Sequence, residues 1–109
     1  MTIEHFLPLS FDWNNIPAQK VNGETGFSII KTQTLGGIKI RHVEYSNDYT
    51  ADHWCEKGHI VFVIQGELII EHKDNSMHYL KRGMTYLVGD NTLAHKVKSK
   101  RGVKALIID

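Results

Sequence analysis

Hydrophobic and polar residues alternate over short stretches along most of this chain. In Ile38-Lys-Ile-Arg, apolar and charged side chains alternate, which is typical of a strand that buries one face. Residues 60–64, Ile-Val-Phe-Val-Ile, are an unbroken β-branched and aromatic run, which predicts a strand buried on both faces. The same criteria predict further strands at residues 27–34, 38–45, 68–72, 77–80, 86–88, 95–98 and 103–108.

Turn signals separate these strands at intervals of roughly 8 to 12 residues. Gly36-Gly37 predicts a tight hairpin, because glycine accepts the positive φ that such turns require. No stretch of a dozen residues has a helical period. The predicted fold class is therefore all-β, as a sandwich or barrel. Further turns are predicted at residues 46–50, 65–67, 74–76, 81–83, 89–91 and 99–102.

The N-terminal residues 1–18 differ from the rest of the chain. They contain aromatic side chains, and Pro8 and Pro17 interrupt any helix. We expect an extended arm that packs on the barrel or on a partner subunit, and for that reason we expect a homodimer. Residues 19–109 are expected to form a single barrel domain.

Composition narrows the classes of function. The chain has 109 residues, of which 41% are hydrophobic and 23% charged, as is ordinary for one soluble globular domain. A formal net charge of +1 argues against nucleic acid or an anionic membrane as the main partner. No apolar stretch approaches the roughly 18 residues that span a bilayer, and no secretory signal is visible. The single cysteine excludes an internal disulfide and predicts a cytoplasmic location.

Three metal-binding side chains, His53, Cys55 and His59, lie close together in the sequence. If this segment is an extended strand, all three point to one face, because side chains at i and i+2 share a face. Imidazole and thiolate groups gathered in this way suggest a transition-metal centre. The alternatives are polar residues packed in a barrel mouth, with Cys55 as a small buried side chain, or Cys55 as an activated nucleophile.

Five further positions bear on such a site. Val61 and Val63 are expected to point inward and to form an apolar floor beneath the metal. His72 and His78 flank a predicted turn and are expected to be exposed. Tyr86 either lines the same cavity or packs elsewhere, because strand alternation alone does not assign its face.

The spacing of these residues resembles the first motif of the cupin superfamily, which is G-x5-H-x-H, three or four residues, E, six residues and G. Its positions are filled without a gap by Asn47, His53, Cys55, His59 and Gly66. The chain is also similar to small single-domain cupins marked by a DHCW motif, although residues 52–55 here read Asp-His-Trp-Cys, with the last two letters in the other order. The resemblance covers residues 40–109 and implies a cupin-type β-barrel, that is, a double-stranded β-helix or jelly roll.

The second cupin motif, G-x5-P-x-G-x2-H-x3-N, is matched less closely. Counted from Gly83, its histidine position falls on Ala94, and one inserted residue in the 89–93 loop brings His95 into that place. The resemblance therefore implies a metal site with four ligands, namely His53, Cys55, His59 and His95.

Two differences from the cupin motif change the expected metal. Cys55 stands where the second histidine usually is, and His59 stands where glutamate usually is. The site keeps one negative charge once the thiol is ionised, but a thiolate is a softer ligand than a carboxylate. We therefore expect a divalent transition metal, with Zn²⁺ favoured and iron, nickel or copper as alternatives.

The resemblance implies a small-molecule ligand next to the metal but leaves the class of function open. An enzyme of dioxygenase, isomerase or hydrolase type needs an open coordination position on the metal. A binding or sensing module is compatible with four protein ligands that close a tetrahedral site. A metal-free barrel that binds a metabolite is the third possibility, since fold does not fix function.

Overall fold

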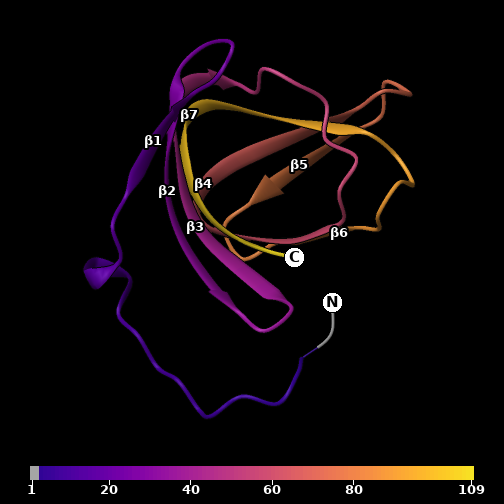
Figure 1. Cartoon of the computed structure of the whole chain (residues 1–109). Coiled ribbons are helices and arrows are strands. Elements are labelled where there is room, and N and C mark those ends of the chain that lie inside the picture. Colours follow the sequence, from indigo (N-terminus) through magenta and orange to yellow (C-terminus); the bar gives the residue numbers. More distant parts are fainter. Residues whose placement is uncertain (1–2) are drawn as a thin grey trace.

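The computed structural model describes residues 3–109, which form antiparallel β-structure with one short 3-10 helix and no α-helix (Figure 1). The all-β prediction is confirmed. No helix in this described part is long and apolar enough to cross a membrane. The elements are η1 (Trp13–Asn15), β1 (Gln19–Asn22), β2 (Phe27–Leu35), β3 (Ile38–Thr50), β4 (His59–His72), β5 (Met77–Lys81), β6 (Thr85–Val88) and β7 (His95–Ile108).

The seven strands form one curved sheet. Their order is β1-β2-β3-β7-β4-β5, and β6 pairs with β4 off this path. Within residues 3–109 the outer strands β1 and β5 are not paired with each other, so the sheet is not closed into a barrel. The long strands β4 and β7 lie side by side in its middle, with Ile60 opposite Ile108 and His72 opposite His95.

Three strands are longer than the sequence indicated. The turns predicted at residues 46–50, 65–67 and 99–102 are wrong, because these residues lie inside β3, β4 and β7. The backbone bends there without ending the strand, since Gly66 and Gly102 have φ values of 85° and 90°. The β4–β7 register also shifts on either side of Gly66. The glycines therefore mark bulges, and the strands curve (Figure 1).

One face of the curved sheet carries the hydrophobic core. Val61 and Val63 are 3% and 0% exposed, which confirms their predicted inward positions. Each fully buried apolar side chain of this size stabilises the fold by roughly 1.5–3 kcal/mol, so the core holds the long strands together. The other members are Val43, Leu68, Ile70, Leu80, Tyr86, Val103, Ala105 and Ile107.

The N-terminal arm lies mostly apart from the sheet (Figure 1). Its first two residues are outside the described part, and residues 3–12 contain no helix or strand. Asp12 caps η1 by accepting a hydrogen bond from the backbone N of Asn14. The arm is anchored where the ring of Trp13 lies 5.7 Å from that of His42 on β3. The side chains before this anchor remain largely exposed, as at Leu7.

Candidate metal centre

Cys55 is positioned by backbone pairing with the first residue of β7. The amide of Cys55 donates to the His95 carbonyl at 2.8 Å, and the amide of His95 donates to the Cys55 carbonyl at 2.9 Å. In such an antiparallel pair the two side chains lie on the same side of the ladder. Cys55 and His95 are therefore held beside each other by the main chain, independently of any ligand.

The segment between Cys55 and β4 is held by a neighbouring loop. The amide of Gly58 donates to Asp90 Oδ1 at 2.6 Å, and the amide of Asn91 donates to the Glu56 carbonyl at 2.8 Å. A Cβ atom at Gly58 would lie 2.8 Å from the Asp90 backbone N, so this close approach requires glycine. These contacts place His59, the first residue of β4, next to Cys55.

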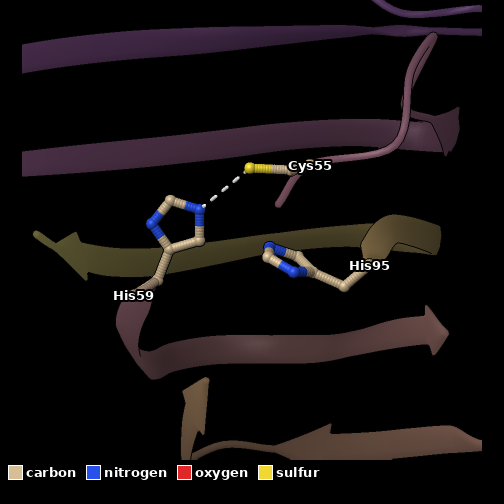
Figure 2. Close-up of side chains that lie close together, drawn as sticks. All are labelled: Cys55, His59 and His95. Carbon is tan, nitrogen blue, oxygen red and sulfur yellow. Dashed lines mark hydrogen bonds between the residues drawn. The ribbon is translucent and has the colours of Figure 1, made fainter. Parts of the chain in front are cut away.

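Cys55, His59 and His95 form a compact cluster of possible metal ligands. Figure 2 shows their side chains pointing toward one another, with Cys55 Sγ 3.4 Å from His59 Nε2. One potential ligand atom from each residue lies within 4.8 Å of the other two. The two imidazole rings are nearly perpendicular, with centroids 5.2 Å apart. The predicted proximity of these three residues is thus observed, and their role as ligands stays a prediction.

The Cys55–His59 distance and the chemistry of this cluster fit a transition metal. With metal–nitrogen and metal–sulfur bonds of about 2.0–2.1 Å and 2.3 Å, a tetrahedral site places its N and S ligands roughly 3.6 Å apart. The observed separation of 3.4 Å between Cys55 and His59 is close to that value. One thiolate and two imidazoles suit Zn²⁺ and its neighbours in the transition series.

The two histidines of the cluster are held in their neutral form. Burial lowers the pKa of His59, and the nearby charge of Arg41 lowers it further, while Asp109 opposes this shift. Burial also lowers the pKa of His95, against a smaller opposing effect of the Leu93 backbone. At neutral pH both rings therefore keep a lone pair, as metal binding requires.

His53, the fourth predicted ligand, lies outside the cluster. Its side chain is 75% exposed, and its Nδ1 lies 2.6 Å from Asp52 Oδ1. The prediction assumed an extended strand through residues 51–59, but residues 51–58 form no strand and pair only through the bridge at Cys55. Strand alternation therefore does not apply to His53, and a ligand role for it stays a prediction.

Asp109 contacts the cluster from the opposite side of the His59 ring and was not predicted from sequence. Its Oδ2 atom lies 2.9 Å from His59 Nδ1 and 3.3 Å from Arg41 Nη2. The side chain is only 4% exposed. Asp109 follows Ile107 by two residues, so strand alternation gave a weak signal for its inward face.

A buried hydrogen-bonded pair, His72 and Tyr86, lies next to the cluster. The prediction that His72 is exposed is wrong, because it is 5% exposed, whereas His78 is exposed as predicted. Tyr86 Oη lies 2.6 Å from His72 Nε2, and the Tyr86 and His95 ring centroids are 6.3 Å apart. His72 follows Ile70 by two residues, so the alternation continued past the end of the apolar run.

Hydrogen-bond chemistry sets which atom donates and which accepts in the contacts of His72. Ser76 Oγ donates to Asp74 Oδ1 at 2.5 Å, since an ionised carboxylate only accepts. Ser76 Oγ can then accept from His72 Nδ1 at 2.9 Å, which leaves His72 Nε2 to accept from Tyr86. Through Ser76, the His72–Tyr86 pair links the buried core to the exposed turn that follows β4.

A cavity opens beside the cluster. Its volume is about 390 Å³, and its walls include His59, Asp109 and Val88. This lies within the range of roughly 300–1,000 Å³ found for small-molecule sites. A larger cleft of about 970 Å³ lies over the bulges of β4 and β7, and none of the three cluster residues lines it.

Comparisons with known proteins identify the fold. No protein-family model matches the chain, and no curated protein matches it. A predicted oxalate decarboxylase from Thermotoga maritima has a similar structure, with a TM-score of 0.78, 8% identity, and 92% of this chain and 96% of that chain covered.

Two further solved structures are similar to this chain in fold. A cupin-like protein from Thermotoga maritima gives a TM-score of 0.71 at 17% identity, over 83% of this chain and 74% of that one. A sugar phosphate isomerase of the cupin superfamily from Silicibacter pomeroyi gives 0.72 at 13% identity, over 92% and 74%. The protein therefore has the cupin fold.

Proposed function

We propose that this protein is a small metallo-cupin that holds a divalent transition metal, with zinc favoured, through Cys55, His59 and His95. The observation that carries this proposal is the 3.4 Å separation of Cys55 Sγ and His59 Nε2 beside the buried His95. The softness of the thiolate supports zinc over Mg²⁺ or Ca²⁺, and iron, nickel and copper remain the alternatives. Residues 52–55, Asp-His-Trp-Cys, contain the four residues of the DHCW motif of small cupins, with the last two in the other order.

The number of ligands bears on the function. Three protein ligands leave one position of a tetrahedral site open, which is the arrangement of catalytic rather than structural zinc sites. The cavity of about 390 Å³ beside His59 supports a small molecule at that position. We accordingly propose small-molecule binding at the metal. Catalysis of a dioxygenase, isomerase or hydrolase reaction on that small molecule would extend this proposal.

A closed four-ligand site is the second candidate. His53 lies two residues before Cys55 on a segment without regular structure, and its side chain contacts only Asp52 among the hydrogen bonds of residues 3–109. A ligand role for His53 requires that its side chain leave Asp52 and turn toward the cluster. Such a site suits a sensing or structural role.

Cobalt substitution separates the two candidates. Co²⁺ bound by Cys55 gives a thiolate-to-metal charge-transfer band, and its visible spectrum reports the coordination number. We expect added azide to change the visible spectrum of wild-type protein, because an open position accepts the anion. A spectrum that responds to azide only in His53→Ala supports the closed site. Absence of the charge-transfer band overturns the proposal.

Location and assembly complete the proposal. We propose a cytoplasmic location, which is supported by the single cysteine, because a reducing compartment keeps it as a thiol. A homodimer is supported by the exposed apolar side chains of Leu7 on the arm and Phe62 and Leu87 on the sheet, which are 86%, 40% and 69% exposed. Light scattering at micromolar concentration tests the dimer, and a monomeric mass contradicts it.

A further inference from the structure

We propose that Asp109 is a positioning residue of the metal centre, which fixes the ring and the tautomer of His59 so that Nε2 faces the other ligands. The inference rests on the proposed metal function but names a residue and a role beyond it. Nδ1 of His59 lies 2.9 Å from Asp109 Oδ2, and Nε2 lies 3.4 Å from Cys55 Sγ.

The chemistry of the carboxylate sets the tautomer. An ionised carboxylate accepts hydrogen bonds and cannot donate one, so the proton of neutral His59 resides on Nδ1. Nε2 then carries the lone pair and faces Cys55. A metal-binding histidine is commonly oriented by a carboxylate on its other nitrogen in this way, and loss of that partner costs about 10–100-fold in metal affinity.

Asp109 is itself fixed by three independent contacts. Its backbone exchanges hydrogen bonds of 3.0 and 2.7 Å with Lys39 at the start of β3. Arg41 Nη2 lies 3.3 Å from its Oδ2, and Lys57 Nζ lies 3.9 Å from the same atom. Two positively charged side chains therefore lie beside the carboxylate of a side chain that is only 4% exposed.

A purely structural role for Asp109 makes a different prediction. In that case the ion pair with Arg41 would tie β7 to β3, and the contact with His59 would be incidental. Replacing Asp109 would then lower the free energy of unfolding without changing the His59 tautomer. It would also leave the intrinsic zinc affinity of the folded protein unchanged.

The experiment compares wild-type protein with Asp109→Asn and Arg41→Gln. Nitrogen-15 NMR of the imidazole rings in metal-free protein reports the His59 tautomer, and competition with a chelator gives the zinc affinity. The control is Asp52→Asn, because Asp52 and His53 form an exposed Asp–His pair outside the cluster. Urea unfolding verifies that each variant is folded.

The outcomes are distinct. We expect the Nδ1–H tautomer in wild-type protein. In Asp109→Asn we expect a shift toward Nε2–H, because an amide can donate to Nδ1, with zinc affinity lower by about 10–100-fold. Arg41→Gln is expected to show a smaller loss in the same direction, and Asp52→Asn none.

An Nε2–H tautomer in wild-type protein overturns the inference, even if Asp109→Asn does not fold. Unchanged tautomer and affinity in a folded Asp109→Asn overturn it as well. Failure of wild-type protein to bind zinc, iron, nickel or copper sinks the proposed function instead, and the tautomer in metal-free protein still decides the orientation.

Discussion

Cys55 and His95 exchange both of their backbone hydrogen bonds, although one lies in an irregular segment and the other begins β7. Two possible metal ligands are thus placed by the main chain. The centre lies at one end of the hydrophobic core. This core is buried without any contribution from a metal, and its members Val63 and Leu68 are both 0% exposed.

Removal of metal should therefore leave the protein folded. After treatment with a chelator we expect an intact β-sheet signal in circular dichroism and a cooperative unfolding transition. Added zinc should raise the free energy of unfolding by about 2.7 kcal/mol when its free concentration is 100 times Kd. An unfolded metal-free protein, as in zinc fingers, would contradict the preformed centre.

Acid should destabilise the metal-free protein below a pH of about 6.5. Burial lowers the folded-state pKa values of His59 and His95 below the unfolded value of 6.5. The unfolded chain then binds more protons, so stability is full above that value and is lost as pH falls toward the folded pKa values. The slope should not exceed about 1.4 kcal/mol per pH unit for each histidine.

Urea unfolding between pH 8 and pH 5 measures this dependence. His95→Gln should reduce the slope. The pKa of Asp52 is lowered by its hydrogen bond with His53, and that of Asp74 by its bonds with Ser76. Protonation of these two carboxyls therefore affects stability only at a more acidic pH than this range. Stability independent of pH over this range would count against buried neutral histidines.

Gly66 should tolerate alanine less well than Gly83, although their φ values are alike at 85° and 86°. A Cβ at Gly66 would lie 2.4 Å from the Gly102 carbonyl oxygen, whereas nothing lies within 4 Å of one at Gly83. Gly83→Ala should cost about 1–2 kcal/mol from backbone strain alone. Gly66→Ala should cost more, because two strands must separate. Equal losses in thermal unfolding would show that the bulge is not tightly packed.

Tyr86→Phe should destabilise the protein by about 1–3 kcal/mol, because it leaves the buried Nε2 of His72 without its donor. Tyr79→Phe is the matched control. Tyr79 is 56% exposed, and its hydroxyl contacts only the Met77 sulfur among the hydrogen bonds of residues 3–109. Its loss should change the free energy of unfolding by no more than about 0.5 kcal/mol. If both variants unfold at the same urea concentration, the His72–Tyr86 bond contributes nothing measurable.

The sequence predicted the features that depend on local patterns. Alternation located the inward positions of Val61 and Val63, and short spacing together with the cupin resemblance selected Cys55, His59 and His95. Turn residues were less informative. Glycine accepts positive φ both in turns and in bulges, so Gly66 and Gly102 carried no signal to distinguish an ending strand from a bending one.

Contacts that depend on strand register could not be predicted. Asp109 reaches His59 because Ile108 pairs with Ile60 across β4 and β7, and no local pattern encodes that pairing. The position of His53 outside the cluster was missed for a related reason. Strand alternation was applied to a segment whose conformation is set by loop contacts and not by a ladder.

The most direct test of the metal centre is elemental mass spectrometry on untagged protein purified without chelator. We expect near-stoichiometric zinc, or another divalent transition metal, in wild-type protein. Cys55→Ala and His95→Ala should lose it, and His53→Ala should retain it. Folded protein that stays free of metal after reconstitution, or that binds metal equally in Cys55→Ala, would contradict the assignment of these side chains as ligands.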